Sequence, residues 1–118
     1  MTDEPTGDEL LAMLSALANP WRLRIMALLS RRSDYVSNLA REVGISRPLV
    51  HMHLKKLEQA GLVTGRLELS QDGKALRYFD VAPVALTITP ETFVRAVKTL
   101  TDTQQTGGSR SQEKGQNP

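Results

Sequence analysis

The chain has 118 residues, of which 40% are hydrophobic and only 4% aromatic, so one domain with an aliphatic core is expected. It contains no cysteine, which excludes disulfides, thiolate metal sites and a cysteine nucleophile. No apolar run approaches the ~20 residues of a membrane span, and the acidic start "MTDEPTGDEL" lacks the basic region of a secretory signal, so we expect a cytoplasmic protein without membrane association.

The net charge of +2 is unevenly distributed along the chain. Residues 1–18 carry four acidic and no basic residues, whereas residues 19–79 carry eleven Lys and Arg against five Asp and Glu. Residues 80–118 are balanced, with four of each sign. Concentrated positive charge is typical of nucleic-acid binders, although a solvated surface would give the same count.

Apolar spacing predicts two helices at the start of the chain. Leucines spaced at i, i+3/i+4 and i+7 place the first helix over residues 8–18, after an acidic, flexible segment over residues 1–7. Asn19 and Pro20 suit the N-cap and first position of a second helix, which ends near residue 30. Its apolar residues lie on more than one side, so we expect this helix to be central.

Two further helices form a predicted helix-turn-helix. Ser33 or Asp34 is expected to cap a third helix over residues 35–43, which Gly44 would end in the left-handed conformation. Ser46 is expected to cap the fourth helix. Two short helices joined by a tight turn that contains glycine are typical of this DNA-binding motif.

A hairpin follows the fourth helix directly. The segments "LVTGRLEL" and "KALRYFDV" flank "SQDG", in which Asp72-Gly73 is a turn signal. Its position predicts the wing of a winged helix-turn-helix. The inward face of this hairpin is expected to come from Leu67, Leu69, Leu76 and Tyr78.

Thr89 is expected to cap a last helix over residues 90–103. Residues 104–118 lack large apolar side chains and cannot offset their ordering entropy, so this tail is predicted to be disordered. The predicted fold is mainly α with a β-hairpin. It is a winged helix-turn-helix of four helices, a hairpin wing and a C-terminal helix over residues 8–103.

A helical wheel divides the fourth helix, residues 46–60, into two faces. Val50, Leu54 and Leu57 share the face expected to pack on the second and third helices. The opposite face starts at the helix N-terminus, the end that usually points into the major groove. Together with the hairpin it supplies the predicted DNA-binding residues: Ser46, Arg47, Pro48, His51, Met52, Lys55, Lys56, Arg66, Lys74 and Arg77.

Arg47 is the best candidate for a bidentate contact to guanine. Lys55 and Lys56 are expected at phosphates, which position a protein without specifying sequence. For the hairpin two interpretations stay open. Its basic residues contact the flanking backbone or minor groove, or they form a charged, solvated edge that discourages aggregation.

The two histidines of the chain, His51 and His53, lie two residues apart on this helix. Their side chains point about 200° apart, so they do not chelate one metal ion. His51 faces outward, as a DNA contact or an idle surface residue, and His53 is expected to be a packed histidine with one hydrogen bond. We expect Arg22 and Arg24 to face solvent or a second copy of the chain.

The first and last helices present more apolar surface than one small winged domain can cover. We therefore expect a homodimer, the alternative being that these helices close a monomer core. A two-fold axis would place two recognition helices in successive major grooves, ~34–36 Å apart, and favour an inverted repeat. The predicted dimer residues are Leu10, Leu14, Leu17, Phe93, Val97 and Leu100.

The chain resembles the ArsR/SmtB-type winged-helix regulators of bacteria. "LSALANPWRLRIMALL" is similar to their "L-A-x-P-x-R-L-x-I-L-x-L-L" opening, and "VSNLAREVGISRPLVHMHLKKLEQAGLV" resembles their helix-turn-helix. The resemblance covers residues 10–82. It implies a homodimeric transcriptional regulator, most often a repressor, that binds operator DNA. In this family an inducer often controls DNA binding.

The chain differs from the metal-binding members of this family at the positions of their metal ligands. Thiol-based members carry a Cys-Val-Cys type segment where this chain has Tyr35, Val36 and Ser37. Others bind zinc or nickel through Asp, His and Glu on the last helix, where this chain has Glu91 and Asp102 but no histidine. We therefore predict no metal site and no identified cofactor. Nickel or zinc bound through His, Asp and Glu stays open, but no spacing supports it.

Two other classes of function are alternatives to a DNA-binding regulator. A winged-helix module that binds a protein uses the same fold, and a regulator controlled by a protein partner or a divalent metal is a variant of the first class. An enzyme is not expected. The sequence holds no Ser/His/Asp arrangement on a plausible elbow, no Gly-rich phosphate loop and no paired carboxylates.

Overall fold

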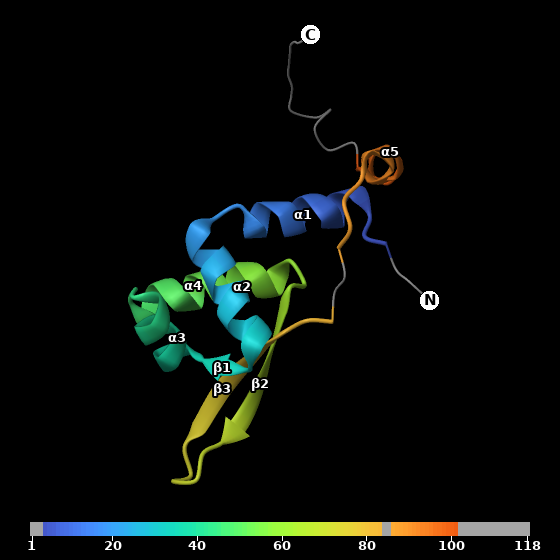
Figure 1. Cartoon of the computed structure of the whole chain (residues 1–118). Helices are drawn as coiled ribbons and strands as arrows, with labels where there is room; N and C mark the ends of the chain where they lie inside the picture. The colour runs from blue at the N-terminus through green and yellow to red at the C-terminus, as the bar shows by residue number, and fades with distance from the viewer. Residues whose placement is uncertain (1–3, 84–85, 102–118) are drawn as a thin grey trace. The chain divides into compact units, whose positions relative to one another are not determined.

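The computed structural model describes residues 4–83 and 86–101, so the predicted tail over residues 104–118 lies outside the described residues. Figure 1 shows the helices and strands. In chain order these are α1 (Gly7–Leu17), α2 (Pro20–Arg31), β1 (Asp34–Tyr35), α3 (Val36–Val43), α4 (Arg47–Gln59), β2 (Val63–Leu69), β3 (Ala75–Val81) and α5 (Pro90–Val97). Among the described residues, every helix is too short or too polar to cross a membrane.

The chain divides into two compact units, one of residues 11–86 and one of residues 1–10 with 87–118. The larger unit contains the helix-turn-helix and the hairpin. Its α2 packs against α3, α4 and β3, and Ile25 of α2 is fully buried, so α2 is central as predicted. The least exposed side chains of this core are Ile25, Leu39, Val50, Leu54, Leu57, Val63 and Phe79.

Polar caps fix the starts of α2 and α4 as the sequence predicts. The Asn19 side chain accepts hydrogen bonds from the backbone N–H groups of Trp21 and Arg22, at 2.9 and 3.1 Å. The Ser46 hydroxyl accepts one from the Leu49 N–H, at 3.4 Å. These bonds satisfy amide donors that have no partner inside the helix.

The turn between α3 and α4 depends on Gly44, whose φ is 85°. A Cβ at this position would meet no atom, so a substitution would act through backbone strain alone. We expect Gly44→Ala to lower the free energy of unfolding by about 1 kcal/mol. Urea denaturation would show this, and Gly44→Asn should lose less because asparagine tolerates the left-handed region. Equal losses for the two variants would contradict the explanation.

A short strand before α3 was not predicted. Asp34 and Tyr35 pair with Phe79 and Tyr78, and this gives a sheet with the order β1-β3-β2. The expected cap by Ser33 or Asp34 is therefore wrong, because Tyr35 is the N-cap residue and makes no side-chain cap bond. A strand of two residues has no periodicity from which the sequence could predict it.

The predicted inward face of the hairpin is also wrong. Leu67 pairs with Arg77, and Glu68 pairs with Leu76. Cross-strand partners share a face, so Leu67 and Leu76 lie on opposite faces of the hairpin. Leu67 and Leu69 are 72% and 78% exposed, whereas Phe79 is 1% exposed and forms the buried anchor.

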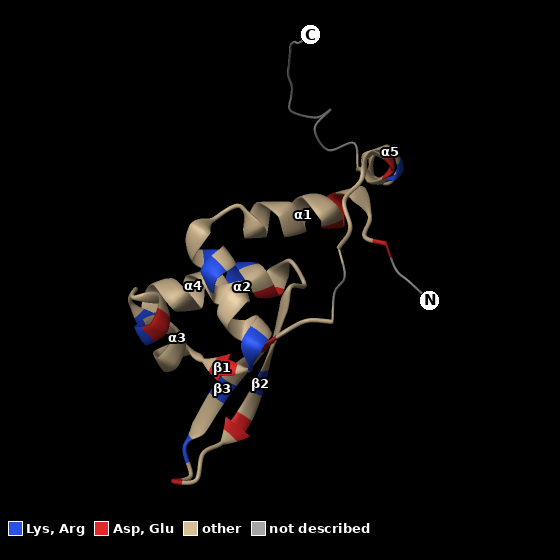
Figure 2. Cartoon of the chain, in the orientation of Figure 1, with Lys and Arg blue, Asp and Glu red and all other residues tan. Residues whose placement is uncertain are grey.

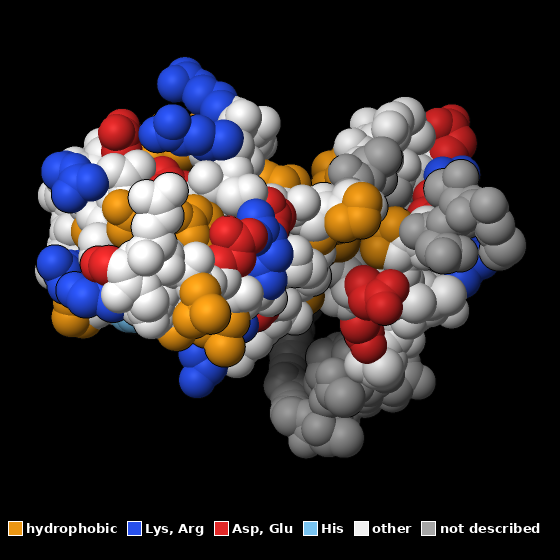
Figure 3. Space-filling view, turned by 90° about the horizontal axis from the view of Figure 1, so that it is seen from below, with side chains coloured by type: hydrophobic (Ala, Val, Ile, Leu, Met, Phe, Trp, Pro, Cys, Tyr) orange, Lys and Arg blue, Asp and Glu red, His pale blue; other side chains and the backbone are white. Residues whose placement is uncertain are grey.

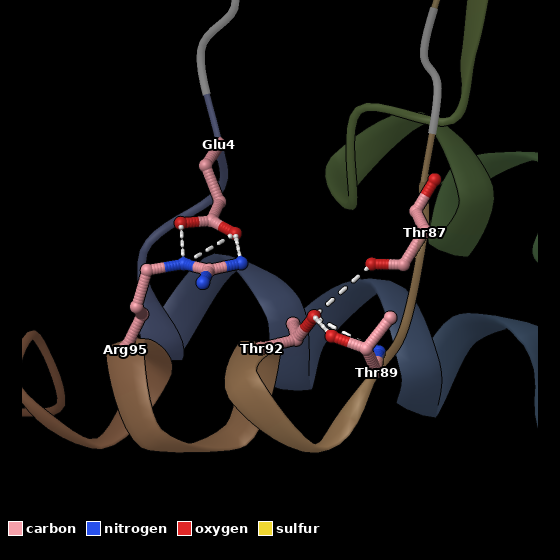
Figure 4. Close-up of polar contacts among 5 residues, drawn as sticks. All are labelled: Glu4, Thr87, Thr89, Thr92 and Arg95. Atoms are coloured by element: carbon pink, nitrogen blue, oxygen red, sulfur yellow. Dashed lines mark hydrogen bonds and ion pairs between the residues drawn. The ribbon is translucent and has the colours of Figure 1, made fainter.

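The smaller unit joins α5 to the start of α1. Figure 4 shows the Glu4 carboxylate paired with the Arg95 guanidinium, at 2.8 Å. The same view shows the Thr92 hydroxyl bonded to the carbonyl of Thr87 and close to the hydroxyl of Thr89. Thr89 caps α5, as predicted, through a reciprocal capping box with Thr92.

The helix α5 ends at Val97, so the predicted end near residue 103 is wrong. The backbone N–H groups of Lys98, Thr99 and Leu100 bond three residues back, which tightens the last turn. The Thr99 hydroxyl also donates to the Ala96 carbonyl, at 3.1 Å, and so takes an acceptor that a longer helix would use.

The first helix begins at Gly7, one residue earlier than predicted, because Thr6 and Glu9 form a capping box. The Gly7 N–H donates to the Thr99 hydroxyl, at 2.6 Å. A Cβ at Gly7 would collide with the Ala96 carbonyl oxygen, so this close approach requires glycine.

Candidate nucleic-acid interface

The outer face of α4 presents basic side chains that have no partner among the described residues. Val50, Leu54 and Leu57 are at most 1% exposed, so the predicted division of α4 into two faces is confirmed. The exposed residues of α4 are Arg47, Pro48, Leu49, His51, Met52, Lys55, Lys56 and Gln59. Within residues 4–83 and 86–101, the side chains of Arg47, Lys55 and Lys56 make no ion pair or hydrogen bond.

The Ser46 hydroxyl caps α4 and is exposed at the N-terminal end of the same face. The first turn of α4 contains Arg47 and Pro48 and no acidic residue. The helix dipole therefore favours an anion at this end, and the Arg47 charge adds to it.

A groove of about 500 Å³ lies between α4 and the hairpin. Its lining combines apolar side chains with charges of both signs: Pro48, His51, Met52, Leu54, Lys55, Glu58, Arg77 and Phe79. Arg77 donates to Glu58 at 2.7 Å, and its guanidinium carbon lies 4.9 Å from the centre of the Phe79 ring. The Glu58–Arg77 ion pair thus links the hairpin to α4.

The second arginine of the hairpin, Arg66, is also held within the molecule. It donates to Asp80 at 2.9 Å and to the Ser33 hydroxyl at 3.0 Å, and it pairs with Glu68. Hydrogen bonds from Ser33 and Arg66 hold the pKa of Asp80 below its ordinary value. Arg66 therefore connects both strands of the hairpin to the segment that precedes β1.

Lys74, at the hairpin turn, is the remaining predicted residue of the wing. Its side chain makes no ion pair or hydrogen bond within the described part of the chain. Figure 2 shows acidic and basic residues close together along the hairpin. Figure 3 shows Lys and Arg side chains in separate groups with hydrophobic and acidic side chains between them. Among the described residues, exposed basic side chains without an ion pair or hydrogen bond thus lie on α4 and at the turn, and also elsewhere, including Arg31, Arg32 and Lys98.

His53 lies on the buried side of α4 and is 4% exposed. Its Nδ1 is 3.1 Å from the Nη1 of Arg22, which also donates through Nε to the Ala16 carbonyl at 2.6 Å. Because arginine only donates, the Nδ1 of His53 accepts, and the ring is neutral with its proton on Nε2. Burial, followed by the Arg22 charge, lowers the pKa of His53 below its ordinary value.

The prediction that His53 is a packed histidine with one hydrogen bond is confirmed. The expectation that Arg22 faces solvent or a second copy is wrong, since its side chain lies between α1 and α4. The pair joins residues 31 positions apart, and no local pattern in the sequence connects them.

The residues at the positions of the family's metal sites are not a suitable set of metal ligands in this chain. Tyr35, Val36 and Ser37 offer no thiolate, and α5 has Glu91 but no histidine. No three His, Asp or Glu side chains of the described residues come close enough together to hold a metal ion. Asp102 lies outside the described residues.

The predicted dimer residues differ in their exposure. Leu10 is 4% exposed in the single chain, whereas Phe93 and Val97 are 54% and 64% exposed. The others, Leu14, Leu17 and Leu100, are half-buried. Further exposed apolar side chains adjoin the predicted ones along each helix, Leu11 in α1 and Val94 in α5.

Residues 19–64 match the model of the arsR family of bacterial regulatory proteins. The resemblance to the arsR family is confirmed. This arsR-type region spans α2, α3 and α4 and the start of β2, so it contains the exposed basic face of α4. Both the family and the fold are those of DNA-binding transcriptional regulators and not of enzymes.

Two relatives and one solved structure show how far the likeness extends. An uncharacterized helix-turn-helix-type transcriptional regulator of Methanocaldococcus jannaschii is 41% identical over 61 residues, which are 52% of this chain and 64% of the relative. A probable mercury resistance operon repressor of Streptomyces lividans is 38% identical over 63 residues, or 53% of this chain and 47% of the relative.

The solved structure is a homodimeric winged helix-turn-helix DNA-binding domain from Mycobacterium bovis, described as a possible ArsR-family transcriptional regulator. It superposes with a TM-score of 0.57 at 29% identity and covers 64% of this chain and 65% of that one. The chain thus spans less than two thirds of each of these three proteins.

Proposed function

We propose that this protein is a transcriptional regulator that binds double-stranded DNA as a homodimer and represses transcription from an inverted-repeat operator in the cytoplasm. The observation that carries the proposal is the outer face of α4. Arg47, Lys55 and Lys56 are exposed and unpaired among the described residues, on the second helix of an arsR-type helix-turn-helix. That helix is the one that enters the major groove in this motif.

The proposal is tested by selecting duplexes from a random-sequence library with the full chain. The selected duplex and a scrambled one are then titrated by fluorescence anisotropy at several salt concentrations. We expect an inverted repeat to be selected, and an affinity that falls steeply with salt as counterions are released. No enrichment of any sequence, together with no binding at low salt, would refute the proposed function.

Lys55→Ala is expected to weaken binding to the selected and the scrambled duplex by similar factors. Lysine at a phosphate carries no sequence information, so the specificity ratio should stay unchanged. The slope of log K against log salt should fall by about 0.9 in magnitude. Lys98→Ala is the matched control, since Lys98 is exposed and lies outside α4. A selective loss on the selected duplex would assign Lys55 to a base instead.

The dimer part of the proposal depends on α5, where Phe93, Val94 and Val97 are exposed. The Mycobacterium bovis domain, to which this chain is similar, is homodimeric. Leu10 is buried within one chain, so we leave it out of the proposed interface.

We expect Phe93→Glu to shift sedimentation towards the monomer and to remove the preference for two half-sites, because it buries an unpaired charge in the interface. Leu23→Glu in α2 is the control, since Leu23 is exposed to a similar degree. A monomeric wild-type chain would contradict the dimer but not DNA binding.

A protein-binding module is the second candidate function. Leu49 and Met52 are each 45% exposed on α4, and Pro48 adds further apolar surface beside them. The DNA titration separates the two candidates, since a protein-binding module would show no sequence selection and no steep salt dependence.

A further inference from the structure

The Arg22 side chain connects three helices of the larger unit. From α2 it donates to the Ala16 carbonyl near the end of α1, at 2.6 Å, and to His53 Nδ1 in α4, at 3.1 Å. Both bonds are partly shielded from water, and the two acceptor residues are buried, with His53 4% and Ala16 5% exposed. Among the described residues, Arg22 is the charged group that acts on the His53 ring.

The same helix carries the proposed DNA-reading face on its other side. His51 and Lys55 are exposed two residues before and after His53, and a helix transmits a displacement of one side to the other because it is rigid. The apolar contacts of Val50, Leu54 and Leu57 hold α4 against the core but have no preferred direction. The bond between Arg22 and His53 is directional and therefore selects one position of α4.

We propose that Arg22 and His53 are a positioning pair, which sets α4 relative to α2 and the end of α1 in the orientation required for sequence-specific DNA binding. This inference rests on the proposed function. Neither side chain touches DNA in this role. Arg22 acts through His53, and the Ala16 carbonyl fixes Arg22 in turn.

The first test compares Arg22→Gln with Arg24→Gln. Both remove one positive charge from α2, but Arg24 stacks on Trp21 and makes no bond to α4. We expect Arg22→Gln to weaken binding to the duplex that the wild-type chain selects by roughly ten-fold and to leave binding to a scrambled duplex within about two-fold. Arg24→Gln should match the wild type on both duplexes.

The second test replaces the acceptor. The Oδ1 atom of asparagine can take the place of the imidazole Nδ1, whereas the Oε1 atom of glutamine takes the place of Nε2. Since Arg22 donates to Nδ1, we expect His53→Asn to keep most of the specific affinity and His53→Gln to lose it. A role in packing alone predicts the opposite order, because glutamine fills more of the space of the histidine ring.

The third test uses pH, measured in the His51→Asn background so that His53 is the one remaining histidine of the chain. Protonated His53 cannot accept from Arg22, so specific affinity should fall as the pH is lowered. Because burial lowers the pKa of His53, this fall should lie below the ordinary histidine pKa of about 6.5. In the His51→Asn, His53→Asn double variant this fall should disappear.

The outcomes are distinct. Equal specific affinity for Arg22→Gln and Arg24→Gln, at concentrations and temperatures where circular dichroism shows both folded, overturns the positioning pair and leaves the proposed function standing. Better binding by His53→Gln than by His53→Asn overturns it as well. If the wild-type chain selects no duplex, the proposed function fails first and the positioning role with it.

Discussion

Phe79→Ala should lower the free energy of unfolding by about 3–5 kcal/mol, as measured by urea denaturation. Phe79 is 1% exposed and is the largest of the fully buried side chains. Its removal leaves a cavity at the point where the hairpin meets the helices, and it also takes away the ring on which the Arg77 guanidinium lies. Both losses act on the folded state.

The matched control for Phe79→Ala is Leu67→Ala in the other strand of the same hairpin. Leu67 lies on the same face as Phe79 but is 72% exposed, so its truncation should change the free energy of unfolding by no more than about 0.5 kcal/mol. Comparable losses for the two variants would mean that the wing buries Leu67 in solution. An effect of Phe79→Ala below about 1 kcal/mol would contradict the cavity argument.

These two residues also show how far the sequence could predict the fold. The turn signal at Asp72-Gly73 placed the hairpin correctly, and the alternation of side chains was right for each strand. The assignment of the inward face failed because it depends on the pairing register. In the observed register Leu67 is opposite Arg77, the neighbour of Leu76 in the chain, so Leu67 and Leu76 lie on opposite faces. Register is a tertiary property, which strand patterns alone do not contain.

The candidate DNA-binding site could likewise be predicted from the sequence only in part. The exposure of Arg47, His51 and Lys55 followed from the period of one helix, which the sequence contains in full. The ion pair of Arg77 with Glu58 joins separate elements. No local pattern predicts such a partner, so the hairpin arginines could be listed as DNA-binding candidates but not recognised as already paired.

The ion pairs of the hairpin arginines bear on the two interpretations of the wing, as a DNA contact or as a charged, solvated edge. Arg66 and Arg77 each have a carboxylate partner, so a phosphate would have to compete with Asp80 and Glu58 for them. Lys74 at the turn has no such competitor among the described residues. The interpretation as a charged edge therefore fits Arg66 and Arg77, and contact with the DNA backbone fits Lys74.

Arg47→Ala is expected to weaken binding to the selected duplex by ~1–3 kcal/mol, or roughly 5- to 150-fold, and to relax the preference at one base pair of each half-site. Arg47 is the first residue of α4, is exposed and has no partner among the described residues, so its fork of donors is available to the O6 and N7 atoms of a guanine. Anisotropy titrations against the selected duplex and its single-base variants measure both effects.

Lys56→Ala is the comparison variant for Arg47→Ala, because it removes one positive charge from another exposed position of the same helix. If both residues bind only phosphate, the two variants should lose equal factors on selected and scrambled duplexes, and the assignment of Arg47 to a base would be wrong. If Arg47 reads a base, only Arg47→Ala should lower the ratio of the two affinities. Arg47 would then contribute to sequence specificity, whereas Lys56 would contribute only to sequence-independent binding.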